Sequence, residues 1–185
     1  MITIEAKNIE YAKTMLGNSP KEIQRALKKS INRTVRTVRT AAAKIVRERY
    51  TISSSSVKER IKIRTAKVNF LKGTVLSTGS PATLTRFDVK KRAKGPVVVR
   101  VLKSSTRKPI RRMFLKSKRG ASAVLPFRRV GKDRYPLTVL RGPSIPSMIG
   151  NEKVLNKLVP LAEETLNKRF LHEIDYRFNK LGGKQ

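Results

Sequence analysis

The excess of positive charge is the feature that most limits how this chain can fold. The sequence has 44 Lys and Arg residues against 12 Asp and Glu residues, which gives 185 residues a formal net charge of +32. Mutual repulsion among these cations opposes compaction. A chain of this composition is typical of proteins that lie beside a polyanion, or inside an assembly that neutralises them.

The positive charge is unevenly distributed along the sequence. Residues 1–19 are neutral, residues 20–64 carry a net charge of +11, residues 65–150 carry +19, and residues 151–185 carry +2. The nearly neutral C-terminal segment therefore suits a packing element. The two basic segments suit a surface that faces a polyanion.

A long amphipathic helix is predicted from residue 20 to about residue 50. Ser19 can serve as its N-cap, Pro20 fits the first helical position, and Glu22 completes a capping box. Apolar residues then recur at steps of three and four and form one stripe. The stripe consists of Ile23, Leu27, Ile31, Val35, Val38, Ala42 and Ile45. A basic helix of this kind could also lie on an anionic membrane, but its length and the lack of bulky aromatic residues favour packing within a fold.

The middle of the chain changes to the period of a β-structure. Residues 51–56 form a serine-rich break, and a short helix with a capping box at Ser56 and Glu59 is expected next. Short runs rich in Val, Leu and Phe follow from about residue 66, and they predict one antiparallel sheet of four to six strands. Residues 129–134 suit a hairpin turn that contains Gly131 and Asp133. Residues 103–120 are expected to form a mobile basic loop.

The C-terminal part predicts a second long helix. A Pro-rich entry at residues 142–150 leads to a helix over about 149–180, which Pro160 should kink or break. The expected fold is a single α+β domain over residues 1–185, with the N-terminal and C-terminal helices packed on a small antiparallel sheet. Its expected segments are 1–19 (lead), 20–64 (helical), 65–142 (basic β region) and 143–185 (Pro-rich entry and helix).

The residues that most enzymes use are scarce. Cys is absent, which excludes disulfides, thiolate metal sites and cysteine catalysis, and the only histidine is His172. The middle of the chain offers only Asp88 and Asp133 as carboxylates, too few for a two-metal centre. We therefore expect a protein that is not an enzyme and that holds no cofactor and no metal.

The sequence predicts neither a membrane-spanning segment nor a signal peptide. No run of about 18 apolar residues could span a bilayer, and the first ten residues, MITIEAKNIE, lack the pattern of a signal peptide. Synthesis in a reducing cytoplasm fits these observations. Phosphate contacts by Lys and Arg would give affinity for nucleic acid without sequence specificity, as in a ribosomal protein.

The order of several short motifs resembles the minor tail protein Z family of long-tailed bacteriophages and prophages, also called tail completion proteins. The resemblance spans roughly residues 20–178. It rests on ALKKSINRTV in the first helix (with Ile31-Asn32-Arg33), VKER (Val57 to Arg60), RVGKDRYPL (Arg129 to Leu137) and Ile145-Pro146. The serine-rich break and the LKSKRG segment (115–120) depart from the family, so loop contacts are not transferred.

The resemblance implies a structural virion protein that acts at the head-proximal end of the tail, in tail assembly and head–tail joining. The implied partners are the terminator, tube or tape-measure protein, copies of the chain in a ring, and viral DNA bound without sequence specificity; no membrane is involved. The alternative is a non-sequence-specific nucleic-acid-binding protein of ribosomal type. Basic residues would contact DNA or neutralise acidic neighbours in the assembly. The candidate contact residues are Arg33, Arg36, Arg39, Lys90, Lys91, Arg92, Lys116, Lys118 and Arg119.

Two proline dipeptides are expected to be architectural. They are Tyr135-Pro136 and Ile145-Pro146. Proline fixes the backbone and lacks an N–H donor, so each dipeptide should end a strand or set a turn rather than bind a ligand.

Overall fold

The computed structural model describes residues 9–16, 19–91, 95–117 and 124–181. The chain divides into two compact units. Unit 1 comprises Met1–Ala42, Ile61–Leu76 and Glu152–Gln185, and unit 2 comprises Ala43–Arg60 and Ser77–Asn151. Each unit is built from separated stretches of sequence, so the chain passes from one unit to the other several times. The expectation of a single domain stays a prediction.

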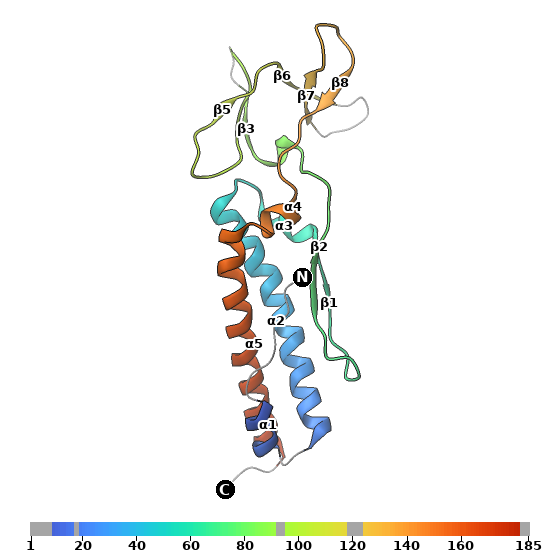
Figure 1. The fold of residues 1–185 in the computed structure, drawn as a ribbon, viewed down its shortest axis with the longest axis vertical. Helices are drawn as coiled ribbons and strands as arrows, with labels where there is room; N and C mark the ends of the chain where they lie inside the picture. Colours follow the sequence, from blue (N-terminus) through green and yellow to red (C-terminus); the bar gives the residue numbers. More distant parts are fainter. Residues whose placement is uncertain (1–8, 17–18, 92–94, 118–123, 182–185) are drawn as a thin grey trace. The chain divides into compact units, whose positions relative to one another are not determined.

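Three helices form the framework of unit 1. They are α1 (Ile9–Met15), α2 (Pro20–Arg49), whose last turns belong to unit 2, and α5 (Glu152–Lys180). Helices α2 and α5 run side by side (Figure 1). Their apolar cluster joins all three helices and comprises Ala12, Leu16, Ala26, Phe170 and Ile174. The two long helices and the small antiparallel sheets confirm the predicted α+β class.

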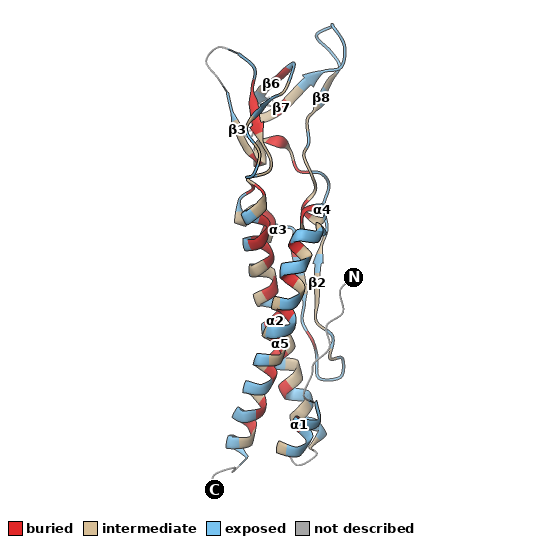
Figure 2. Ribbon diagram, turned by 60° about the vertical axis from the view of Figure 1, so that its left-hand side comes forward, coloured by how far each residue is buried: buried red, intermediate tan, exposed pale blue. Residues whose placement is uncertain are grey.

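Helix α2 has nearly the predicted bounds but a wider buried face than its apolar stripe. Val35 of the stripe is buried as expected, while Ser30 and Thr34 on a neighbouring row are buried too. Figure 2 shows buried residues along much of α2. The Ser30 hydroxyl donates to the carbonyl of Ala26 at 2.9 Å, and the Thr34 hydroxyl donates to that of Ser30 at 2.8 Å. These bonds to the preceding turn satisfy the hydroxyls, so small polar side chains can be buried here without an unpaired group.

An ion pair joins α2 to α5. The carboxylate of Glu22 accepts hydrogen bonds from Arg25 of its own helix and from Arg177 of α5. Burial alone would raise the pKa of Glu22, but the hydrogen bonds from Arg177 and Arg25 outweigh it and the pKa is lowered. The charged carboxylate therefore stabilises unit 1. Whether Glu22 also closes the predicted capping box stays a prediction.

Helix α5 continues through Pro160, so the helix does not break there. The other predicted effect of this proline, a kink, stays a prediction. The predicted helix over 149–180 is instead two elements, α4 (Ile145–Ile149) and α5. Buried side chains flank Pro160 on the same helix face, at Leu158 and Ala162, and recur every four residues as far as Ile174. Packing along this row outweighs the missing hydrogen bond of one proline, whose own side chain is exposed.

A two-stranded sheet of β1 (Ile61–Arg64) and β2 (Thr74–Ser77) follows α2 in unit 1, except for the last residue of β2. The sequence placed residues 61–64 in the helical segment. The IKIR segment, however, alternates apolar and basic side chains with the period of a strand, and Ile61 is buried. Its connection to β2 is fixed to α2 through Asn32. The Asn32 amide donates to the Ala66 carbonyl at 3.1 Å and accepts from the Ala66 N–H at 2.6 Å.

Unit 2 begins with the end of α2 and a short helix, α3 (Ser54–Glu59). This helix starts earlier than predicted, because Ser53 rather than Ser56 is its N-cap and accepts a hydrogen bond from the Ser56 N–H. The serine-rich segment, interpreted as a break, thus supplies the cap and the first turn.

The strands of unit 2 form two three-stranded sheets, so the prediction of one larger sheet is wrong. The first has the order β3 (Asp88–Lys90), β4 (Val98–Arg100), β5 (Lys108–Pro109), and a 3₁₀ helix, η1 (Leu84–Arg86), precedes it. The second has the order β6 (Met113–Ser117), β7 (Val124–Arg129), β8 (Leu137–Val139). All their pairings are antiparallel. Strands β5 and β6 lie in the segment predicted as a mobile loop, whose residues 118–120 fall outside the described residues.

One threonine joins the end of α2 to the first sheet. The Thr51 hydroxyl donates to the carbonyl of Arg100 in β4 at 2.5 Å and accepts from the N–H of Asp88 in β3 at 3.2 Å. Its backbone N–H donates to the carbonyl of Val101 at 2.9 Å. Thr51 therefore bridges both strands and fixes where the chain leaves the helix.

The predicted hairpin at residues 129–134 is confirmed as the connection between β7 and β8. Arg129 pairs with Leu137, and the Val130 N–H donates to the Pro136 carbonyl at 3.2 Å. Gly131 and Asp133 lie in this connection and are exposed.

We expect Gly73→Ala to destabilise the protein by about 1–3 kcal/mol through overpacking against α2. A Cβ at this position would lie 2.5 Å from Ile31 Cγ2 and 2.8 Å from Val35 Cγ1. Both methyl groups sit on branched carbons and cannot easily move away. Urea unfolding of Gly73→Ala beside Gly131→Ala, where a Cβ meets open space, measures the difference. Equal stability of the two variants would contradict this packing.

Candidate functional site

The sequence of unit 2 holds the larger share of the positive charge. It contains 24 Lys and Arg residues against four acidic residues, which are Glu48, Glu59, Asp88 and Asp133. Four carboxylates cannot neutralise 24 cations within the fold. The unit therefore presents a strongly positive surface, which raises the local concentration of anionic partners.

Asp88 of this unit pairs with two arginines. Its Oδ2 lies 2.7 Å from a guanidinium nitrogen of Arg107 and 2.9 Å from one of Arg100, its neighbour across β3 and β4. The hydrogen bond from Arg107 lowers the pKa of Asp88, burial opposes this effect, and the charges of Arg107 and Arg100 add to the lowering. Two of the cations are thus committed to the sheet rather than to a partner.

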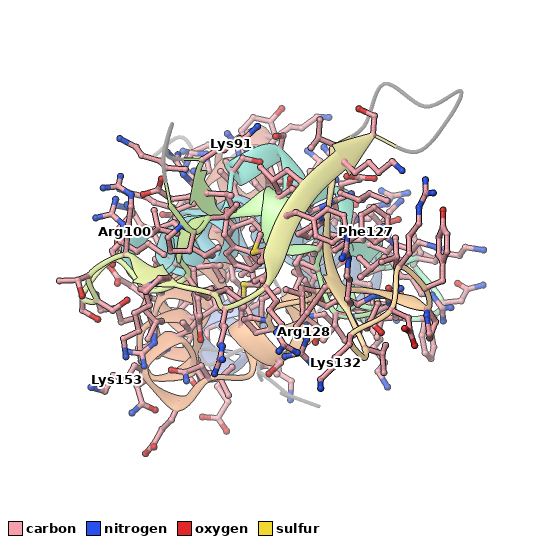
Figure 3. The ribbon with its side chains drawn as sticks, turned by 90° about the horizontal axis from the view of Figure 1, so that it is seen from above. Lys91, Arg100, Phe127, Arg128, Lys132 and Lys153 are labelled. Atoms are coloured by element: carbon pink, nitrogen blue, oxygen red, sulfur yellow. The ribbon has the colours of Figure 1, made fainter. Side chains whose placement is uncertain are left out.

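The predicted contact residues divide between the two units. Arg33 and Arg36 are exposed on α2 in unit 1, and Arg39 is half-buried on the same helix. In unit 2, exposed lysines lie in β3, directly after it, and in β6; these are Lys90, Lys91 and Lys116 (Lys91 is labelled in Figure 3). The remaining predicted residues, Arg92, Lys118 and Arg119, lie outside the described residues.

An open hollow of about 440 Å³ lies beside the β6–β8 sheet and is lined largely by arginines that the sequence analysis did not select. We call it the arginine hollow. Its lining residues are Arg111, Arg112, Arg128, Arg129, Val130 and Thr138 (Arg128 is labelled in Figure 3). The sequence pattern that could have indicated the hollow is a pair of Arg-Arg dipeptides, of which the first is Arg111-Arg112 and the second is Arg128-Arg129. Only the pairing of β6 with β7 brings them together.

The strand register explains how the two dipeptides meet. Arg128 of β7 lies opposite Met113 of β6 on one side and Thr138 of β8 on the other. The first dipeptide immediately precedes Met113. It therefore lies beside the end of β7, which contains the second dipeptide. Within the described part of the chain, the guanidinium groups of all four arginines have no hydrogen bond and no ion pair.

A tight turn positions the first dipeptide. The Met113 N–H donates to the Ile110 carbonyl at 3.3 Å, which closes a four-residue turn with Arg111 and Arg112 at its centre. Arg112 has φ 59°, in the left-handed region where glycine is favoured and a long side chain is uncommon.

The two proline dipeptides occupy different structural settings. Pro136 follows a cis peptide bond and precedes β8, and Tyr135 is exposed. Ile145 is buried as the first residue of α4, and Pro146 lies in the first turn of that helix, where a missing N–H costs nothing. The element at Pro146 is therefore a helix start rather than the strand end or turn that was expected. Their roles in stability stay predictions.

Among the described residues, no group of three or more His, Cys, Asp and Glu side chains could hold a metal ion. In the same part of the chain, no helix is long and apolar enough to cross a membrane.

The comparison with known families decides the identity of the chain. A family model described as prophage minor tail protein Z (GPZ) matches residues 7–181, nearly the whole chain. The chain belongs to this family. The match confirms the resemblance seen in the motifs and extends it beyond residues 20–178 in both directions. Searches of curated proteins and of solved structures found no match.

Membership in the minor tail protein Z family makes the chain a phage minor tail protein. The family is one of structural tail proteins, and it implies the virion tail as the location and tail proteins as partners. The positive surface thus belongs to a protein that forms part of a larger assembly.

We expect Asp88→Asn to lower the melting temperature at neutral pH, because Arg100 and Arg107 lose their shared counter-charge. The folded-state pKa of Asp88 lies below its usual value of 3.8, so its stabilising effect is present above about pH 4 and is lost as the pH falls through the folded pKa. The melting temperature of Asp88→Asn should therefore fall less steeply than that of the wild type between about pH 6 and pH 3. Asp133→Asn, with the same change of charge in an exposed loop, is the control, and equal pH profiles for both variants would exclude this role.

Proposed function

We propose that this protein completes the phage tail at its head-proximal end and prepares the tail for head joining and DNA delivery. The family match over residues 7–181 carries the proposal, because it covers the long helices and the strand-rich unit together. The proposed role is structural and needs no catalysis. The protein would be made in the host cytoplasm and then incorporated into the tail.

The charge of the chain suggests how it would act at this position. Copies arranged as a ring around the tail axis would add their positive fields and attract DNA without reading its bases. The exposed cations of α2 (Arg33 and Arg36) and of unit 2 (Lys90, Lys91 and Lys116) are available for such contacts. Acidic surfaces of the terminator, tube or tape-measure protein are the other proposed partners of these residues.

Incorporation into tails is the first test. Purified, nuclease-treated tails that lack the protein are mixed with it in about 0.15 M salt, where long-range charge effects are largely screened, and sedimented. We expect stoichiometric pelleting and restored head joining. Failure to pellet, combined with tight salt-dependent binding to bare RNA or DNA, would contradict the tail role and favour a nucleic-acid-binding protein of ribosomal type.

Grouped neutralisation tests the DNA contact. We expect Lys90→Gln/Lys91→Gln/Lys116→Gln to weaken binding of a duplex oligonucleotide. Each lost phosphate contact should also reduce the salt dependence of log affinity by about 0.9. Fluorescence anisotropy over a range of KCl concentrations measures both quantities. Unchanged affinity and an unchanged salt slope would show that these three lysines do not contact DNA. That result would not bear on the proposed incorporation of the protein into tails.

A further inference from the structure

We infer that the arginine hollow is a phosphate-binding site that holds the backbone of duplex DNA. This inference rests on the DNA contact of the proposed function and adds the place on the molecule where that contact is made. None of the four arginines belongs to the set predicted from the sequence.

The side chains that line the hollow suit a bound phosphate group. Its lining contains four arginines, one threonine and one valine, and no acid. Arginine presents donors in a planar fork that can bind two phosphate oxygens at once, and two adjacent forks can hold neighbouring oxygens. The four guanidinium groups have no partner among the described residues, so they repel one another, and a bound polyanion would remove that repulsion.

The backbone at Arg112 is a second, independent observation. This residue occupies the turn position with φ 59°, which glycine would occupy without strain. An arginine at this position destabilises the turn, so a purely structural account gives no reason for it. Strained residues gather at binding sites, and binding accounts for the side chain here, because Arg112 lines the hollow.

An acidic protein segment is the competing ligand, and the lining argues against it. Interfaces between proteins have cores enriched in apolar and aromatic side chains, whereas only Val130 is apolar among the lining residues. Interfaces with DNA are more polar and strongly positive. The hollow therefore fits a phosphate backbone better than a peptide.

The test compares Arg128→Gln/Arg129→Gln with Lys103→Gln/Lys108→Gln. Both pairs remove two charges from unit 2, and the control lysines are exposed and lie outside the hollow. The probes are a fluorescent 20-base-pair duplex of mixed sequence and an oligoglutamate, each titrated over a range of KCl concentrations. We expect the arginine variant to bind the duplex about tenfold more weakly than the control variant, with the slope of log affinity against log salt reduced by up to about 1.8.

The outcomes separate the inference from the proposed function. Equal loss of duplex binding in the two variants would mean that only net charge matters and would overturn the inference, and so would a loss confined to oligoglutamate. If the wild type does not bind the duplex at all, both the proposed DNA contact and this inference are wrong. Restoration of head joining by the wild type, measured separately, tests the tail role independently of either result.

Arg112→Gly tests the site without loss of the fold. Glycine relieves the turn, so the melting temperature should stay the same or rise. Affinity for the duplex should nevertheless fall and its salt slope should decrease. A variant with unchanged affinity would show that the strained arginine has no part in binding and would overturn the inference for this residue.

Discussion

The scarcity of acidic side chains is the constraint on which the rest of the structure depends. Twelve carboxylates serve 44 cations, so a carboxylate at a structural junction has to satisfy more than one partner. Glu22 accepts bonds from two arginines where α2 meets α5, and Asp88 does so where β3 meets β4. Each unit thus places an acid where two elements join.

The same constraint shapes the interior. A chain with 38% hydrophobic residues has little material for a core, and the sheets formed by its described residues have only two or three strands. Buried hydroxyls such as those of Ser30 and Thr34 extend the packed face of α2, because each bonds to its own helix. Small cores joined by a few multiply bonded residues suit a protein that is stabilised further by its neighbours in an assembly.

The sequence alone was sufficient to predict the two long helices and the family, but not the strand pairing. Helix α2 is predictable because its apolar residues repeat locally, and the order of short motifs indicated the tail protein family before the structure. Strand β6 was missed because its MFLKS segment becomes a strand by pairing with β7, and the pattern of the segment alone does not show that pairing. The arginine hollow was missed for the same reason, since Arg112 and Arg129 meet only through that pairing.

Helix α2 has a consequence for the evolution of the chain. Its buried residues Val35 and Val38 belong to unit 1, and its buried residues Ala43 and Val46 belong to unit 2, with no interruption between them. Proteins usually exchange domains by recombination at exposed linkers, where few interactions are cut. Along this helix there is no such linker, so a crossover would divide a continuous element. The two units should therefore be inherited as one module.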